Sequence, residues 1–197
     1  MNIWAVIPVQ PLEEGKSRLA GVLSAPERFQ LNQRFFTHVL KTAVTVFPPS
    51  RVIVVSRSAD VLRAAGDAQT LSETGSGDLN VALTEAARAA RRLGAEAVLS
   101  LSSDLPVLET ADLQAMCAAM AADTAVIAPD RAGVGTNAML CPVKSVAYAY
   151  GESSFARHQA LMEAQDLGVI AMRREGLAFD IDTPADLERL RNLRPGF

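Results

Sequence analysis

Three aspartates offer the clearest chemistry in this sequence. Asp104 follows an apolar run at 97–102, which is typical of a buried strand in a parallel sheet. Ligands of such sheets bind just beyond the carboxyl ends of the strands. Asp180 and Asp182 form a second acidic cluster, and their alternation predicts that both lie on one face of a short strand. If the three converge, they form an all-oxygen site suited to Mg²⁺ bridging phosphates.

A loop with two cations follows the first predicted strand, Ile3 to Val9. The loop runs from Gln10 to Arg18, and Lys16 and Arg18 come just after a glycine. Backbone N–H groups and two cations in this arrangement can bind a triphosphate. The spacing of a Walker loop is absent. The alternative is that both side chains are solvated surface residues.

A second candidate loop runs from Glu73 to Asn80 and contains two glycines. Glycines let the backbone approach a ligand, and Asp78 and Asn80 offer the carboxylate and amide that a purine edge needs. The alternative is a flexible loop in which Asp78 or Asn80 is a helix N-cap. The sequence leaves both interpretations open.

Two later segments could bind a small anion. In the segment 130–137, two glycines precede Thr136 and Asn137, which predicts a loop whose backbone and hydroxyl bind an anionic group. The segment Tyr150 to Phe155 precedes a helix predicted at 156–166.

The start of that predicted helix carries further candidates. Ser153 or Ser154 is its expected N-cap, and its free N–H groups suit a phosphate or a carboxylate. His158 is predicted in the first turn, where a cation opposes the helix dipole unless an anion lies nearby. The alternative is simply a capped helix.

The elements that must position these residues alternate along the chain. Apolar runs predict strands at 3–9, 51–56, 69–71, 97–102, 125–129, 138–141, 169–171 and 178–182. Helical periodicity and capping residues predict helices beginning at 25, 60, 81, 110, 156 and 184, with Ser24, Thr110 and Thr183 as N-caps. This alternation indicates an α/β fold: a three-layer α/β/α domain with a mostly parallel central sheet. Neither a repeat nor a linker is evident, so residues 1–197 are expected to form one domain.

Composition narrows the function classes. The chain has 197 residues, 49% hydrophobic residues and a net charge of -3, which gives no overall electrostatic case for nucleic acid as a partner. We expect no membrane interaction, because no apolar run approaches about 20 residues and the N-terminus lacks a signal peptide pattern. Cys117 and Cys141 match no zinc or redox spacing, so we expect reduced thiols and a cytoplasmic protein.

The motifs, taken in order, carry a resemblance over nearly the whole chain. They are Pro8-Val9, Lys16-Ser17-Arg18-Leu19, Gly77-Asp78-Leu79-Asn80, Asp104-Leu105-Pro106, Gly135-Thr136-Asn137, Gly151 with Ser154-Phe155 and His158, and Asp180-Ile181-Asp182-Thr183-Pro184. This set resembles the CofC/FbiD family of guanylyltransferases of coenzyme F(420) biosynthesis. The resemblance implies a nucleotidyltransferase fold of the MobA-like, GT-A type. One departure is Gln10, where family members often carry a lysine.

The resemblance implies an activity and a set of roles. The family transfers GMP from GTP to a small phosphorylated carboxylic acid, namely 2-phospho-L-lactate, phosphoenolpyruvate or 3-phospho-D-glycerate, and releases pyrophosphate. The implied ligands of Mg²⁺ are Asp104, Asp180 and Asp182. The implied GTP contacts are Pro8, Lys16, Arg18, Gly77, Asp78, Asn80 and Asp104, of which Lys16, Arg18 and Asp104 are catalytic. The implied contacts of the phosphoacid are Thr136, Asn137, Gly151, Ser154 and His158.

The implied reaction suits the composition, because a phosphate oxygen is already a nucleophile at pH 7 and needs no general base. Catalysis then rests on alignment and charge neutralisation. The alternatives are another MobA-like nucleotidyltransferase with a different acceptor and a non-catalytic nucleotide-binding module. The acceptor, the number of Mg²⁺ ions and the oligomeric state, a homodimer among the options, stay open at this point.

Overall fold

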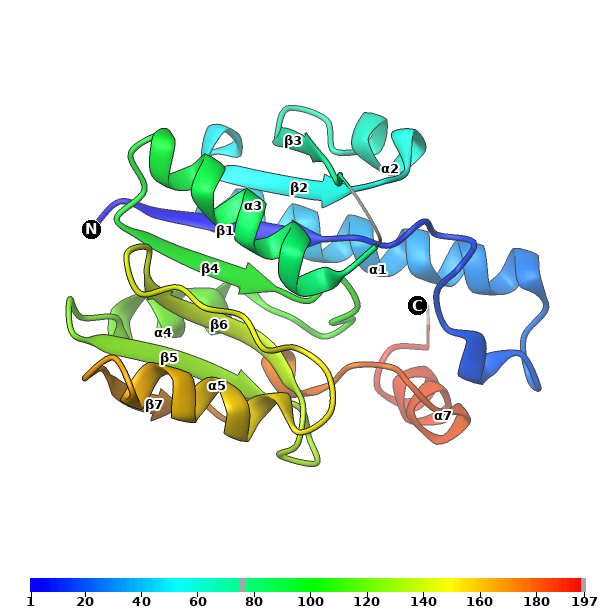
Figure 1. Ribbon diagram of the computed structural model, residues 1–197. Helices are drawn as coiled ribbons and strands as arrows, with labels where there is room; N and C mark the ends of the chain where they lie inside the picture. The colour runs from blue at the N-terminus through cyan, green and yellow to red at the C-terminus, as the bar shows by residue number, and fades with distance from the viewer. Residues whose placement is uncertain (75–76, 196–197) are drawn as a thin grey trace.

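A seven-stranded β-sheet lies at the centre of the computed structural model, which describes residues 1–74 and 77–195. The spatial order of the strands in these residues is β3-β2-β1-β4-β6-β5-β7 (Figure 1). Their bounds are β1 (Ile3–Pro8), β2 (Val52–Ser56), β3 (Gln69–Ser72), β4 (Ala97–Leu101), β5 (Thr124–Pro129), β6 (Thr136–Pro142) and β7 (Gly168–Ala171). Neighbouring strands are parallel except where β6 pairs with β4 and β5. The predicted mostly parallel sheet is confirmed.

Strand β1 shows why these segments form a buried sheet. Its Ala5 and Ile7 pack into the core on one face, and Trp4 and Val6 pack into the core on the other. Successive side chains of a strand point to opposite faces, so a strand covered on both sides must be apolar throughout. Strands β2 and β4 follow the same rule, with every residue buried.

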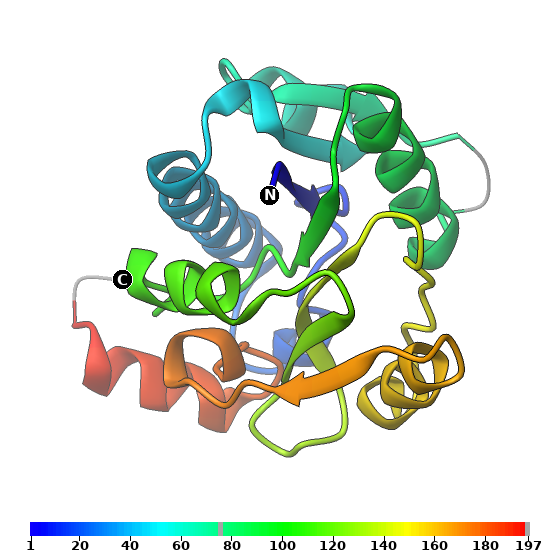
Figure 2. The same ribbon diagram turned by 90° about the vertical axis from the view of Figure 1, so that its left-hand side faces the viewer.

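Helices cover both faces of the sheet. Their bounds are α1 (Ala25–Val46), α2 (Ala59–Ala64), α3 (Leu79–Arg92), α4 (Thr110–Ala119), α5 (Ser154–Glu163), α6 (Glu175–Ala178) and α7 (Pro184–Leu193), with 3-10 helices η1 (Ser17–Leu19) and η2 (Pro49–Arg51). Helices α1, α2, α4 and α6 join the core on one face, whereas α3 and α5 pack on the other (Figures 1 and 2). The predicted three-layer arrangement is therefore confirmed.

Two predicted helix starts are correct. At α1, the Ser24 hydroxyl accepts from the Glu27 N–H, and the Glu27 carboxylate accepts from the Ser24 N–H at 2.7 Å. At α7, Thr183 is the N-cap and Pro184 occupies the first turn, where its missing N–H costs nothing.

The predicted start of α4 is wrong by one residue. The carboxylate of Asp112 accepts the N–H of Glu109 at 2.9 Å, so Glu109 is the N-cap and Thr110 is already helical. The reason is that a first-turn carboxylate three residues into a helix can satisfy the backbone of the capping residue whatever side chain that residue carries.

The predicted strand at 178–182 is also wrong. Ala178 ends α6, and Phe179 to Asp182 connect α6 to α7 outside the sheet. The predicted alternation nevertheless holds, because Phe179 and Ile181 are buried while Asp180 and Asp182 are only partly buried. The apolar pair packs with side chains of α1 and α7 rather than with a neighbouring strand.

One edge of the sheet gathers the segments that matter for function. The carboxyl ends of β1, β2 and β4 point to the same side, toward the loop after β1 and toward α7, at the right of Figure 1. A small apolar cluster that includes Leu19, Phe35, Phe179 and Leu187 holds η1, α1 and α7 together there. In the described ranges, no helix is long and apolar enough to cross a membrane, and Cys117 and Cys141 are free.

Candidate active site

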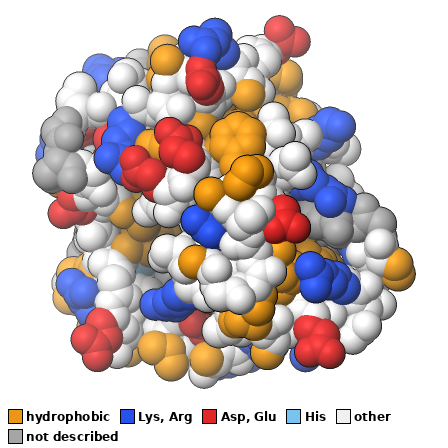
Figure 3. All heavy atoms as spheres, turned by 90° about the vertical axis from the view of Figure 1, so that its right-hand side faces the viewer, with side chains coloured by type: hydrophobic (Ala, Val, Ile, Leu, Met, Phe, Trp, Pro, Cys, Tyr) orange, Lys and Arg blue, Asp and Glu red, His pale blue; other side chains and the backbone are white. Residues whose placement is uncertain are grey.

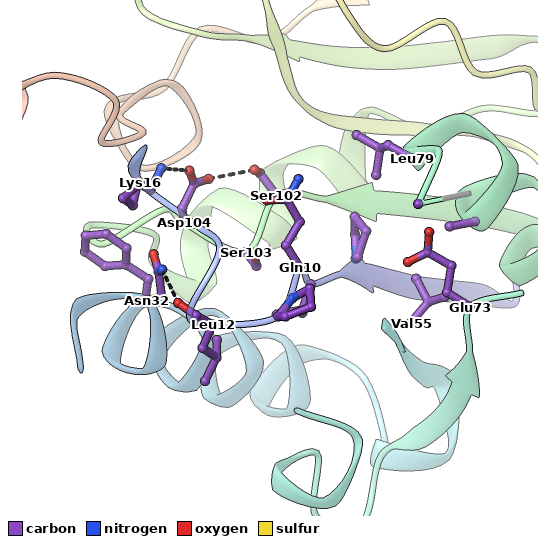
Figure 4. Close-up of a pocket in the computed structure, with 17 residues that line it drawn as sticks. Gln10, Leu12, Lys16, Asn32, Val55, Glu73, Leu79, Ser102, Ser103 and Asp104 are labelled. Atoms are coloured by element: carbon purple, nitrogen blue, oxygen red, sulfur yellow. Dashed lines mark hydrogen bonds and ion pairs between the residues drawn. The ribbon is translucent and has the colours of Figure 1, made fainter. Parts of the chain in front are cut away.

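A cavity of about 250 Å³ opens at the carboxyl ends of β1, β2 and β4. Lys16 and Asp104 line one end, and Val55, Glu73 and Leu79 line the other (Figure 4). From this edge, acidic and basic side chains are interspersed on the surface rather than separated into a single-sign patch (Figure 3). The cavity is elongated, with a charged end and a largely apolar end.

The charged end is built around Lys16. Its ammonium contacts the carboxylate of Asp104 and lies 3.3 Å from Oδ1 of Asp182. Arg18 is largely exposed and contacts Oδ2 of Asp182 at 3.1 Å, and the Ser102 hydroxyl donates to Asp104 at 2.7 Å. Burial alone would raise the pKa of Asp104, but the Lys16 charge and the hydrogen bonds from Lys16 and Ser102 together hold that pKa below its usual value. Lys16, Arg18, Asp104 and Asp182, which the sequence analysis singled out in separate segments, lie together at this end of the site.

The loop that presents Lys16 is fixed by α1. The Asn32 amide donates to the carbonyl of Leu12 at 2.7 Å, and a Cβ on Gly15 would lie 2.5 Å from that amide nitrogen. A side chain at position 15 would have to displace the Asn32 amide from this hydrogen bond. Lys16 itself has φ 60°, a left-handed conformation that costs a non-glycine residue free energy and clusters at functional sites.

Asp180 completes a group of three carboxylates. Burial, followed by the charges of Asp104 and Asp182, raises the pKa of Asp180 to about 6. The Asn137 amide favours the charged form of Asp180, although its nitrogen makes no hydrogen bond of ordinary geometry.

The three carboxylates fit Mg²⁺ by donor type, because hard divalent cations prefer carboxylate oxygens. Among the described residues, no three acidic, histidine or cysteine side chains are arranged to hold a metal ion. The Lys16 ammonium contacts both Asp104 and Asp182. Lys16 is the counter-charge of the site in this arrangement. The magnesium site stays a prediction.

The other end of the cavity contains part of the predicted purine site. Pro8 and Gly77 line the cavity, whereas Gly75 and Ser76 lie outside the described residues. Asp78 is the N-cap of α3, and its Oδ1 accepts the N–H groups of Asn80 at 2.7 Å and Val81 at 3.3 Å. The capping alternative therefore holds for Asp78.

Asn80 connects two parts of the site. Its side-chain oxygen accepts the Tyr150 N–H at 2.6 Å, and its amide nitrogen donates to the Tyr150 carbonyl at 3.3 Å. The Asn80 side chain thus holds the start of α3 against the segment that leads into α5.

Sequence reasoning missed Glu73. Its carboxylate lines the end of the cavity opposite Lys16 (Figure 4). Glu73 directly follows β3 at the edge where the parallel strands end, and its N–H donates to the Ser56 carbonyl at 3.0 Å. The rule that singled out Asp104 could have singled out Glu73 as well, since both follow a parallel strand at its carboxyl end.

Thr136 and Asn137 are buried residues of β6, so the predicted loop ends before them. The Ser102 N–H donates to the Asn137 carbonyl at 2.8 Å, which sets this end of β6 beside the end of β4. The loop that precedes β6 is closed by Asp130, whose carboxylate accepts the N–H groups of Val134 and Gly135, each at 2.8 Å. The segment before β6 is therefore a turn closed by its own hydrogen bonds, and not the open anion-binding loop that the sequence predicted.

Helix α5 begins at Ser154, two residues earlier than predicted. Neither serine caps it with a side chain; Ser153 has φ 53° and Ser154 is buried. Gly151 has φ +126°, a conformation that favours glycine. His158 is fully buried beyond the first turn, so its predicted place as a first-turn cation is wrong. Burial, with the Arg157 charge, lowers the pKa of His158 to about 4.

Sequence comparisons connect this geometry with known proteins. A family model described as guanylyl transferase CofC like matches residues 3–191. The phosphoenolpyruvate guanylyltransferase of Sphaerobacter thermophilus is 40% identical over 99% of this chain and 95% of its own length. The protein of the same name from Conexibacter woesei is 39% identical over 98% of this chain and 89% of its own length. The chain belongs to the CofC-like guanylyl transferase family.

Solved structures support the fold of this CofC-like protein. A protein assigned as a nucleotide-diphospho-sugar transferase from Desulfovibrio desulfuricans superposes with a TM-score of 0.79, at 18% identity over 99% of this chain and 88% of the other. A nucleotidyl transferase from Methanothermobacter superposes with a TM-score of 0.67, at 18% identity over 98% and 99% of the two chains. The predicted nucleotidyltransferase fold is confirmed, and CofC-like membership favours a guanylyltransferase over the two alternative functions.

Proposed function

We propose that the protein is a cytoplasmic enzyme that transfers GMP from GTP to the phosphate of a three-carbon phosphoacid in coenzyme F(420) biosynthesis. Phosphoenolpyruvate is the first acceptor to test, because the relatives named above carry it in their names. The observation that carries the proposal is the convergence of Lys16, Asp104 and Asp182 at one end of the elongated cavity.

In the proposed reaction, a phosphate oxygen of the acceptor attacks the α-phosphorus of GTP. The new P–O bond forms as the bond between the α-phosphorus and its bridging oxygen to the β-phosphorus breaks, and pyrophosphate leaves with that oxygen. The acceptor oxygen is already anionic at pH 7, so no residue has to remove a proton. Lys16 and Arg18 are assigned to the phosphates, where they neutralise charge on the departing pyrophosphate.

Asp104, Asp180 and Asp182 are assigned to Mg²⁺, which supplies charge neutralisation at the phosphates when bound. Two of the three carboxylates have an ion-pair partner, Lys16 for Asp104 and Arg18 for Asp182, and the Asn137 amide lies beside Asp180. A Lys16 ammonium bound to phosphates instead of Asp104 would leave the oxygens of Asp104 free to hold the cation.

Glu73 is assigned to the guanine base. A carboxylate accepts two hydrogen bonds side by side, and guanine offers a matching pair of donors, its ring N1–H and its 2-amino group. Adenine has no such pair. Val55 and Leu79 line the same end of the cavity and provide apolar surface for the purine ring.

Thr136, Asn137, Gly151 and Ser154 are assigned to the acceptor. Support comes from their position, since Asn137 lies next to Asp180 and β6 lies beside the end of β4. The N-terminus of α5 has no side-chain cap, and uncapped helical N–H groups suit an anion.

Pyrophosphate release tests the proposed function. The enzyme is incubated with GTP and Mg²⁺ and with phosphoenolpyruvate, 3-phosphoglycerate or 2-phospholactate in turn. We expect release with one of them, and loss of release in Asp104→Asn. Asp123→Asn is the matched control, because Asp123 is an exposed carboxylate that precedes β5 at the opposite edge of the sheet. Folded protein that binds GTP and releases nothing with all three would contradict the proposed acceptor class.

A further inference from the structure

His158 is a polar side chain with no exposed surface, and both of its ring nitrogens have a partner. Its Nε2 lies 2.9 Å from the backbone nitrogen of Ala149, and its Nδ1 lies 3.0 Å from the hydroxyl oxygen of Thr136. The Tyr150 ring packs edge-on against the imidazole, with ring centroids 4.7 Å apart. The imidazole therefore has one position between α5, β6 and the segment before α5.

The chemistry of these partners fixes the direction of both hydrogen bonds. A backbone N–H can only donate, so Nε2 of His158 accepts and carries no proton. The buried ring is neutral at pH 7, since burial lowers its pKa to about 4. A neutral imidazole has one N–H, which must then be on Nδ1. Thr136 is consequently the acceptor of that N–H.

The Thr136 hydroxyl is left with a proton to donate. Among the residues that the structure describes, none accepts a hydrogen bond from this hydroxyl. Thr136 is buried, so bulk water does not simply take that role. Thr136 begins β6 at the edge where β4 ends, because the carbonyl of its neighbour Asn137 accepts the Ser102 N–H at 2.8 Å, two residues before Asp104.

We propose that His158 is a positioning residue that fixes the Thr136 hydroxyl as a hydrogen-bond donor to an anionic oxygen of the acceptor substrate. The proposal rests on the proposed function and adds a specificity determinant to it. A hydroxyl that can rotate serves a donor or an acceptor equally well, whereas one held by His158 favours an anion. His158 does not touch the substrate itself.

The hydrogen-bond direction can be tested without turnover. Two-bond ¹H–¹⁵N correlation spectra of the full-length protein, ¹⁵N-labelled at histidine, distinguish the Nδ1–H tautomer from the Nε2–H tautomer and from the imidazolium. The chain has only two histidines, and His38→Gln assigns the signals. We expect the Nδ1–H tautomer for His158 at pH 7. The Nε2–H tautomer or an imidazolium would overturn the proposal.

Kinetics test the consequence for the acceptor. His158→Phe removes the donor to Thr136, and we expect the KM for phosphoenolpyruvate to rise about tenfold to a hundredfold, as for loss of a hydrogen bond to a charged group, with the KM for GTP little changed. His158→Gln is the matched variant, because its amide can accept from Ala149 and donate to Thr136 in the same order. It should restore most of the affinity.

His158→Phe leaves the Ala149 N–H unpaired and could fail to fold, so a second variant tests the same proposal. Thr136→Val keeps His158 in place and should raise the same KM, and the double variant should add little to either single change. An unchanged acceptor KM in Thr136→Val, or equal effects on both substrates, would overturn the proposal. If the wild-type enzyme releases no pyrophosphate with any acceptor, the proposed function is what fails, and the tautomer still decides the hydrogen-bond direction.

Discussion

The side chain of Asn80 hydrogen-bonds to both backbone polar groups of Tyr150, with distances of 2.6 Å and 3.3 Å. Asn80 lies in the first turn of α3, beside the cavity, and Tyr150 directly precedes Gly151 on the acceptor side. The Tyr150 hydroxyl also lies 3.1 Å from the Ser100 hydroxyl on β4. One side chain thus connects the proposed nucleotide side of the site to the proposed acceptor side.

Asn80→Ala should affect both substrates. Loss of the two hydrogen bonds is expected to lower the free energy of unfolding by about 1–3 kcal/mol and to raise both KM values. Urea unfolding and initial rates measure the two effects. Asn192→Ala, at an exposed position of α7, is the control. An effect on GTP alone would mean that Asn80 acts only on the nucleotide side.

Asp104→Asn should remove turnover and leave the fold intact. The amide keeps the shape of the carboxylate but loses its charge, so Lys16 loses its main ionic partner and the cation site loses a ligand. We expect kcat to fall about a hundredfold to a thousandfold, as for loss of a preorganised charge at a reacting centre. Pyrophosphate release and circular dichroism are measured in parallel. Near-normal kcat with GTP would contradict the assignment of Asp104.

Glu73→Gln should weaken the preference for guanine. Inosine triphosphate keeps the ring N1–H and lacks the 2-amino group, so it isolates one of the two proposed hydrogen bonds. We expect the wild-type enzyme to prefer GTP over inosine triphosphate by about tenfold in kcat/KM, and the variant to lose that preference. Glu96→Gln, far from the cavity, is the control. The same ratio in Glu73→Gln and wild type would exclude a role in base recognition.

His158 makes stability depend on pH. Because the folded state lowers its pKa to about 4, the unfolded chain binds more protons than the folded chain between about pH 4 and 6.5. Stability is therefore fully present above about pH 6.5 and is lost as the pH falls toward 4, by up to about 3 kcal/mol from this residue.

The measurement is urea unfolding from pH 4 to 7 for the wild type and His158→Gln. The variant should show a shallower dependence on pH. The pKa of His38 is lowered as well, mainly by burial, and its contribution is common to both proteins and cancels in the comparison. Parallel curves for the two proteins would show that His158 is not the titrating group.

Much of the fold could be predicted from local patterns. The apolar runs of β1, β2 and β4 are long enough to require a covered sheet, and Asp104 follows from the rule about carboxyl strand ends. The strand predicted at 178–182 was wrong because its alternation of apolar and polar residues is not unique to strands. An extended connection that packs apolar side chains against helices has the same alternation. Only the presence of a hydrogen-bonding neighbour, which is a long-range property, distinguishes the two.

Charged residues at strand ends and in loops could be predicted as site residues from the sequence. Residues whose role depends on their neighbours in the fold could not. Asp104, Asp180 and Asp182 were singled out by their places at predicted strands, and Lys16 by its loop after the first strand, but the ion pairs that Lys16 makes with Asp104 and Asp182 belong to the fold. Nothing local to His158 indicates that Ala149 and Thr136 would enclose it, and its neutral state follows from that enclosure. Glu73 was overlooked because β3 is short and mostly exposed, so the end of that strand carries a weak sequence signal.

The contact between Lys16 and Asp182 joins positions 166 residues apart. During synthesis, nearly the whole chain must leave the ribosome before this contact can form, and contacts of such long sequence separation are slow to close. A chain that ends before Asp182 lacks one of the two carboxylates that contact Lys16. The charged end of the cavity is therefore complete only after the segment before α7 has folded back onto the loop after β1.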